Sequence, residues 1–260
     1  MIDTAEKYFR IYSMTKKIPQ PVLHKFTFQA TYKPNLKFYD LLYSATQKLS
    51  GYEHWETNRL YVFLHDYEKH CTLAVRHNVF SYEWDYSGAS NYINDVKDTL
   101  EILPTSLEIK TFRRLGFRKH FLIPTHMRFE EVNNILNLKF LAQDEQLTNL
   151  FPSGVTDMSY VAVGTDDELE FRIVVGPMKR KEISSYIQVN QKYNFAPDKP
   201  SDYASVLSSY PEISVYLDID VFRRDEETGI PIDYGLNFLE KANSMVQENL
   251  STLNEYIFAK

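Results

Sequence analysis

The chain has 260 residues, of which 43% are hydrophobic and 15% aromatic, so it can bury a sizeable core and is not expected to be disordered. Its net charge of -6 argues against broad electrostatic binding to nucleic acid or to an anionic membrane surface. No apolar run approaches the roughly 20 residues that cross a bilayer, and the single cysteine, Cys71, has no disulfide partner within the chain. We therefore expect a cytoplasmic protein without a membrane partner.

The first part of the chain is predicted to form an α+β subdomain (21–150) behind an N-terminal arm or short helix (1–20) that ends at two prolines. Alternation of polar and apolar residues indicates strands, and apolar residues three or four apart indicate helices. Strands are expected over 24–32, 58–65, 71–84 and 112–123, and helices over 36–49, 91–103 and 127–141.

The turn residues at 151–154 form the best internal boundary, although a loop inside one domain would also explain them. A second α+β subdomain is expected over 151–260. Its predicted elements are strands over 158–164, 169–176, 183–189 and 213–222, a loop over 191–201, and helices over 201–208 and 234–257. The fold class is therefore expected to be α+β, with antiparallel β-sheets from two halves and helices packed on them.

The strand expected over 112–123 has an unusual polar face. Side chains on a strand point alternately to opposite faces. One face therefore carries Arg114, Gly116, Arg118 and His120, and the other carries Leu115, Phe117, Phe121 and Ile123. Two arginines on either side of a glycine need carboxylates, phosphates or water in front of them.

The strand expected over 213–222 carries Asp218 and Asp220 on one face, about 7 Å apart at Cα. If the two strands adjoin, Arg114 and Arg118 can pair with these aspartates and fix the two halves to each other. Alternatively, the arginines bind a phosphate or carboxylate in an open cleft, the aspartates hold a metal or take a proton, and His120 serves acid–base chemistry. These five residues are the candidate ligand-binding set.

The remaining motifs are weaker. The histidine and cysteine spacings match no zinc pattern, and the sequence has no Gly-rich phosphate loop, nucleophile elbow or metalloprotease helix motif. We therefore assign no catalytic residue, no metal ligand and no cofactor. The basic run Lys179, Arg180 and Lys181 is a weak nucleic-acid candidate, and a solvated turn explains it better in an acidic chain, so a nucleic-acid partner is not expected.

Several segments match the pattern of a known family. They are Pro21 and Val22 with the strand that follows, the sequence Arg-Leu-Gly-Phe-Arg at 114–118, Leu-Asp-Ile-Asp at 217–220, and the closing helix with Phe238. Together they resemble the TIGR04255 family of sporadically distributed prokaryotic proteins of unknown function, over nearly the whole chain. Lys119 and His120 depart from the aromatic residue and asparagine that are more usual there. The resemblance implies a prokaryotic, cytoplasmic protein without an assigned activity, and the sporadic occurrence suggests a link to defence or mobile elements.

Two functions stay open at this point. The first is a non-enzymatic protein-binding or adaptor protein, in which an aromatic surface drawn from 19 Tyr and 17 Phe engages another protein or a second copy of the chain. The second is a nucleotide- or phosphate-binding enzyme or sensor centred on the paired arginines and aspartates. The lack of a recognisable catalytic set in the sequence favours the first.

Overall fold

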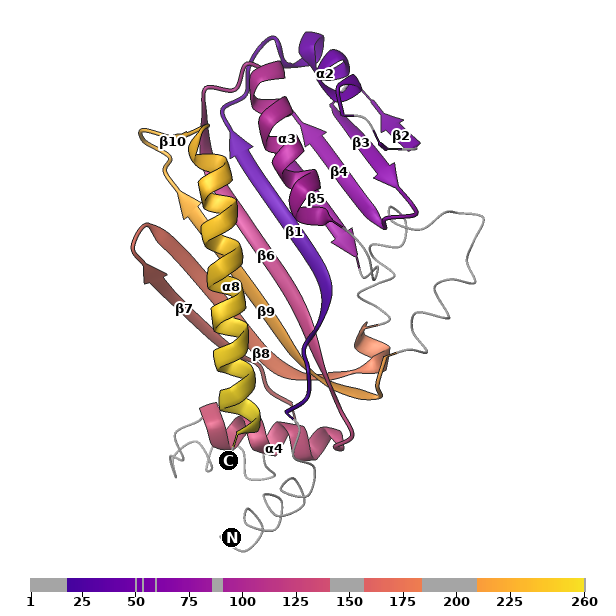
Figure 1. The fold of residues 1–260 in the computed structure, drawn as a ribbon, viewed down its shortest axis with the longest axis vertical. Helices are drawn as coiled ribbons and strands as arrows, with labels where there is room; N and C mark the ends of the chain where they lie inside the picture. Colours follow the sequence, from indigo (N-terminus) through magenta and orange to yellow (C-terminus); the bar gives the residue numbers. More distant parts are fainter. Residues whose placement is uncertain are drawn as a thin grey trace, which may run out of the picture.

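The computed structural model describes residues 18–49, 51–52, 54–58, 60–85, 91–140, 157–183 and 210–259. Their strands form one ten-stranded antiparallel sheet in the order β2-β3-β4-β5-β1-β6-β9-β8-β7, with the short β10 paired to β6 (Figure 1). The α+β prediction is confirmed, and strands from both halves of the chain share this sheet.

The bounds of the elements are as follows. The strands are β1 (Val22–Tyr32), β2 (His54–Thr57), β3 (Tyr61–Asp66), β4 (Cys71–Arg76), β5 (Val79–Asp85), β6 (Thr111–Thr125), β7 (Tyr160–Asp166), β8 (Leu169–Lys179), β9 (Ile213–Arg224) and β10 (Ile230–Pro231). The helices are α2 (Phe38–Gln47), α3 (Tyr92–Ser106), α4 (Phe129–Phe140) and α8 (Tyr234–Phe258).

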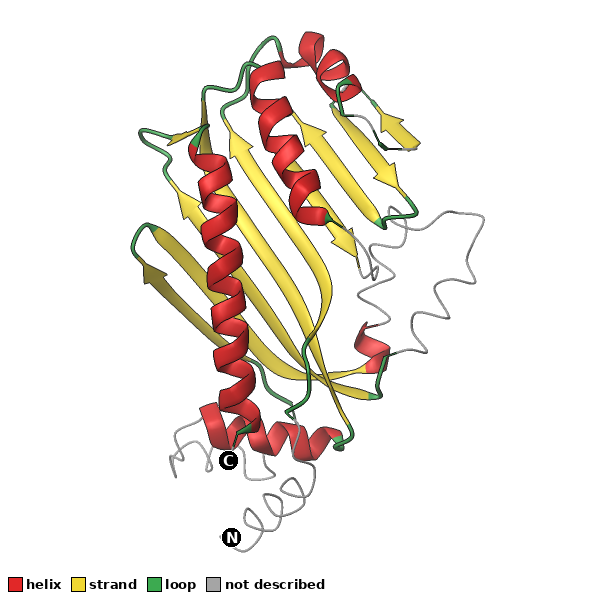
Figure 2. Cartoon of the chain, viewed as in Figure 1, coloured by secondary structure: helices red, strands yellow, loops and turns green. Residues whose placement is uncertain are grey.

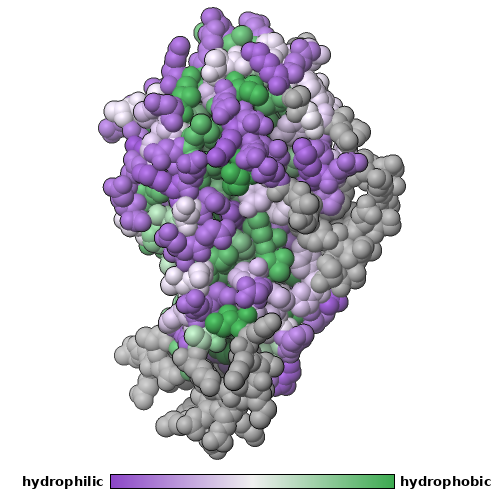
Figure 3. Space-filling model, in the orientation of Figure 1, coloured by the Kyte–Doolittle hydropathy of each residue, from purple (hydrophilic) through white to green (hydrophobic). Residues whose placement is uncertain are grey.

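Helices α3 and α8 lie side by side on one face of the sheet (Figures 1 and 2). Helix α2 lies beside the β2 edge of the sheet, and α4 crosses the ends of the strands near the last turn of α8. Among the described residues, no helix is both long and apolar enough to cross a membrane. In space-filling form, hydrophilic side chains predominate over the upper part of this helix-bearing face, with hydrophobic ones between them (Figure 3).

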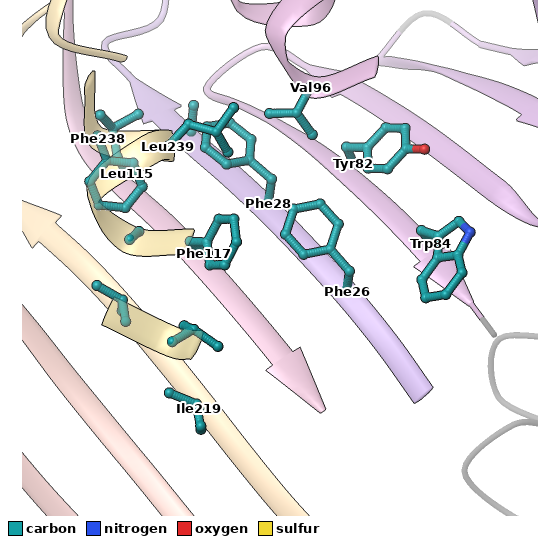
Figure 4. Close-up of a cluster of buried hydrophobic side chains, with 14 of the residues drawn as sticks. Phe26, Phe28, Tyr82, Trp84, Val96, Leu115, Phe117, Ile219, Phe238 and Leu239 are labelled. Carbon is teal, nitrogen blue, oxygen red and sulfur yellow. The ribbon is translucent and has the colours of Figure 1, made fainter. Parts of the chain in front are cut away.

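The hydrophobic core fills the space between the sheet and helices α3 and α8 (Figure 4). Phe26 and Phe28 of β1 meet Phe117 of β6 and Phe238 of α8, and all four side chains are buried. Burying one such aromatic side chain stabilises the fold by about 1.5–3 kcal/mol. The apolar face of β6 predicted from its alternation is thus the face that the helices cover.

The two halves of the chain repeat one arrangement. Each begins with a strand and a helix, continues with antiparallel strands, and ends with a helix. In each half the first strand pairs with the last long strand, β1 with β5 and β6 with β9, and the two first strands pair with each other at the centre of the sheet. The sequence carries no convincing repeat, so this symmetry is visible only in the fold.

Some predicted elements differ from those observed. The β-rich run 71–84 is broken at a two-residue turn, since Arg76 pairs with Val79, and it forms β4 and β5. Strand β2 was not predicted, because four residues with mixed polarity give no clear periodicity.

Two prolines also proved less disruptive than expected. Helix α3 continues one turn past Leu103 with Pro104 inside it, and β6 continues through Pro124. The pairing of β6 with β1 ends at Leu122, so the proline lies where one edge of β6 has no strand beside it among the described residues. A proline is tolerated there because no ladder hydrogen bond is lost on that edge.

Several predictions lie outside the described residues. These are most of the N-terminal arm, the boundary at 151–154, nearly all of the strand 183–189, the loop 191–201 and the helix 201–208. The division into subdomains at residue 150 therefore stays a prediction.

The turn between β9 and β10 requires glycine at position 229. Gly229 has φ +82°, and a Cβ there would lie 2.5 Å from Thr111 Oγ1. We expect Gly229→Ala to lower the free energy of unfolding by more than the roughly 1–2 kcal/mol of left-handed backbone strain, because the clash adds to it. The measurement is urea denaturation.

Gly51→Ala is the matched control for this variant. Gly51 also has positive φ, +109°, but nothing lies within 4 Å of the position that a Cβ would take there. It should show the backbone cost alone, and an equal loss in both variants would contradict a role for the contact with Thr111.

Candidate functional site

The predicted arginine face lies on the side of the sheet away from α3 and α8. Strand β6 pairs with β9 in a register that sets Arg118 opposite Asp220 and His120 opposite Asp218. The structure thus brings together all five candidate ligand-binding residues on two adjacent central strands.

Arg118 and Asp218 form the tightest ion pair of this group. The Arg118 Nε and Nη2 atoms donate to the two Asp218 carboxylate oxygens at 2.7 and 2.6 Å, a bidentate arrangement. Arg172 of β8 approaches the same carboxylate, with Nη1 3.6 Å from Oδ2. The Asp218 side chain is 3% exposed whereas that of Arg118 is 41% exposed, so the buried partner is the carboxylate.

The Arg114 side chain lies along β6 over Gly116, two residues further on in the strand. Its Nη1 donates to Gln29 Oε1 at 2.9 Å, and its Nη2 lies 3.6 Å from Asp220 Oδ2. A Cβ on residue 116 would meet Arg114 Nη1 at 2.6 Å, so the glycine leaves the space in which this guanidinium lies. Burial raises the pKa of Asp220 despite the opposing arginines, and burial also lowers the pKa of Arg114.

His120 is buried beside this cluster and is neutral. Burial, reinforced by the charge of Arg118, holds its pKa well below the ordinary value. Its Nδ1 lies 2.5 Å from the Tyr216 hydroxyl and 3.7 Å from Asp218 Oδ1. A neutral, buried imidazole in these contacts acts as a structural hydrogen-bonding group at neutral pH.

The basic run at 179–181 is partly engaged by the protein itself. Lys179 Nζ lies 3.9 Å from the centre of the Phe129 ring, a cation–π distance. Arg180 Nη1 lies 3.7 Å from Glu212 Oε2. Lys179 and Arg180 therefore already have partners within the fold.

A groove lies elsewhere, between α2 and the edge of the sheet. This groove of about 530 Å³ is lined by Tyr39, Leu42, Tyr43, Thr57, Asn58, Leu60 and Val62. Three of its side chains are more than half exposed: Tyr39 (53%), Tyr43 (61%) and Leu60 (58%). Trp55 of β2 lies edge-on against Tyr43, with 6.3 Å between ring centroids. We call this surface the α2–β2 groove.

The amphipathic character of α2 explains the groove. Phe38, Leu42 and Ala45 are buried against the core, which leaves Tyr39 and Tyr43, four residues apart, on the outer face. The outer face of a surface helix typically carries charged and polar residues rather than large aromatic ones. The four-residue spacing of these two tyrosines is the sequence signal that marks this surface.

The structure also adds charged residues to the predicted cluster. Arg172 contacts Asp218, and Arg224 lies against Phe222 on the same face of the sheet. Arg172 comes from β8, whose pairing with β9 was not predicted from the sequence, and Arg224 lies two residues beyond the end of the strand predicted over 213–222. Within the described part of the chain, no three His, Cys, Asp or Glu side chains are grouped so that they could hold a metal ion.

Comparisons with known proteins do not identify a family for this chain. No family model matches the chain, and no curated protein matches it. A solved structure described as Methanococcus jannaschii TBP is similar at 8% identity with a TM-score of 0.28, covering 90% of this chain and 99% of that one. A TM-score this low carries no argument about function, and the resemblance to the TIGR04255 family stays a prediction.

Proposed function

We propose that this is a non-enzymatic binding protein that holds an extended segment of another protein in the α2–β2 groove. The observation that carries the proposal is the concentration of exposed apolar side chains, Tyr39, Tyr43, Trp55 and Leu60, around this one groove. Large exposed apolar groups gathered in this way are typical of interaction sites, and tyrosine and tryptophan are the commonest anchors in them.

The neighbouring sheet edge supports an extended partner. Strand β2 is the last in the sheet order, so no described strand pairs with its outer side. Its backbone N–H and C=O groups on that side can accept an added strand. A groove of about 530 Å³ is large enough for one or two large side chains of that strand.

A second copy of the chain fits the groove less well. A twofold dimer through this surface would set one groove against another, and neither would be filled. A different protein with a protruding aromatic or aliphatic side chain beside an extended segment fills it directly. The sequence resemblance is the reason to propose further that this partner belongs to a prokaryotic defence system or mobile element, in the cytoplasm.

The proposal is tested by selecting peptides from a displayed random library on the wild-type protein and measuring their affinity by calorimetry. We expect selected peptides to share an apolar anchor within an extended segment. Tyr43→Ala should weaken their binding tenfold or more, because it removes an aromatic wall of the groove.

Tyr256→Ala is the matched control. Tyr256 is an exposed tyrosine on α8, outside the residues that line the groove. Its replacement should leave the affinity unchanged. Peptides that bind both variants as tightly as the wild type, or a selection that yields no specific peptide, would contradict the proposal.

A further inference from the structure

Two arginines lie next to each other at the end of the β6–β9 ladder, on the arginine face. Arg114 of β6 and Arg224 of β9 are direct partners in the register of the two strands. Directly opposed like charges on adjacent strands destabilise a sheet. This arrangement therefore needs a compensating contact.

The contact within the protein is an aromatic ring. The guanidinium carbon of Arg114 lies 5.1 Å from the centre of the Phe222 ring, and that of Arg224 lies 4.5 Å from it. Phe222 is nearly fully buried, so the two guanidinium groups cover one ring. Cation–π attraction offsets part of the repulsion, but it leaves both positive charges in place.

The carboxylates around the pair do not neutralise it. Arg114 has Asp220 at 3.6 Å, whereas Arg224 is exposed and has no carboxylate within 4 Å in the described part of the chain. Burial lowers the pKa of Arg114, and repulsion from Arg224 and Arg118 lowers it further, whereas attraction by Asp220 and Glu170 raises it. Arg224 is thus the member of the pair that has no ion-pair partner among the described residues.

Other groups beside the pair suit an anion. Gln29 accepts a hydrogen bond from Arg114 through its Oε1, so its amide group is fixed next to the guanidinium with its N–H donors on the same face. Gly116 has no side chain, which lets the Arg114 guanidinium lie flat over the strand beside Gln29. The planar forks of two arginines match the oxygens of a tetrahedral oxyanion.

We propose that Arg114 and Arg224, with Gln29 beside them, bind the phosphate group of a small molecule on the helix-free face of the sheet. A phosphate carries about two negative charges at neutral pH and so balances two guanidinium groups. The site lies on β6 and β9, whereas the α2–β2 groove lies between α2 and the β2 edge of the sheet, so the two proposals stand or fall independently.

The test is thermal unfolding and calorimetry with inorganic phosphate, against chloride at matched ionic strength. Phosphate should raise the Tm of the wild type and bind it measurably. Arg224→Gln should weaken phosphate binding about tenfold or more, since one charge-assisted contact is lost. In chloride alone, the same variant should melt at a higher temperature than the wild type, because the like-charge repulsion is gone.

Arg76→Gln is the matched control, since Arg76 is an exposed arginine on β4, a strand that is adjacent to neither β6 nor β9. It changes the net charge equally and should keep phosphate binding. Stronger stabilisation by succinate than by phosphate would overturn the choice of phosphate. The whole site would be overturned by a wild type that phosphate does not stabilise, or by an Arg224→Gln variant that binds phosphate as the wild type does.

Discussion

Replacing Arg118 with glutamine is expected to destabilise the protein more than replacing its partner Asp218 with asparagine. Without Arg118, the 3% exposed Asp218 carboxylate keeps, among the described residues, the longer contact to Arg172 and a neutral histidine, so a charge stays buried with poor compensation. Such a loss costs about 3 kcal/mol or more. Without the carboxylate charge, the 41% exposed Arg118 side chain can reach water, and the cost is about 1–2 kcal/mol.

Urea denaturation at neutral pH measures both variants. The double variant Arg118→Gln with Asp218→Asn should be more stable than Arg118→Gln alone, because it removes the uncompensated carboxylate. A larger loss of unfolding free energy for Asp218→Asn than for Arg118→Gln would contradict this explanation. So would a double variant whose loss equals the sum of the two single losses.

Replacing Lys119 with methionine is expected to stabilise the protein at neutral pH. Lys119 lies on the helix-covered face of β6 and is 1% exposed. Its Nζ donates to Asn243 Oδ1 at 2.7 Å and lies over the rings of Tyr92 and Phe117, with no carboxylate within 4 Å among the described residues. Burial lowers its pKa from 10.5 to about 8. A shift of this size corresponds to about 3 kcal/mol against the charged form.

The stability difference between the wild type and Lys119→Met is expected to depend on pH. Below pH 8 the lysine is charged in both the folded and unfolded states, so the folded state bears the full cost of the buried charge. Between pH 8 and about 10.5 the folded state releases its proton first, and wild-type stability rises. Methionine has a similar shape and no charge, so Lys119→Met should gain about 1–3 kcal/mol at pH 7 and lose this advantage near pH 10.5.

Unfolding free energies of both proteins across this pH range, from urea titrations, provide the measurement. The difference between them removes the contributions of all other titrating groups. A difference that does not change between pH 7 and pH 10.5, or a strongly destabilised variant at pH 7, would contradict the buried charge.

The fold class and the polar face of β6 followed from periodicity because each side chain on a strand has only two directions to point. The partnership of β6 with β9 was one of two interpretations of the opposite charges on the two strands, two arginines four residues apart and two aspartates two residues apart. Lys119 shows the limit of this approach. The alternation puts it on the apolar face, but the sequence cannot indicate that Asn243, 124 positions away, accepts a hydrogen bond from its ammonium group.

The α2–β2 groove could not be predicted from the sequence for a different reason. Its walls come from α2 and from two strands of which one, β2, has no clear periodicity. The tyrosines of α2 mark an unusual helix face, but whether a helix face lies beside an open sheet edge is a matter of tertiary packing. The same holds for Arg224, whose position opposite Arg114 depends on the register of strands 110 residues apart.

The proposal of strand addition at the α2–β2 groove is tested most directly by amide hydrogen exchange of the protein with and without a selected peptide. The account predicts new protection of the β2 amides at His54–Thr57, together with slower exchange in the first turns of α2, and little change along β7 at the other edge of the sheet. Protection confined to β7 or to the arginine face, with β2 exchanging as in the free protein, would contradict it.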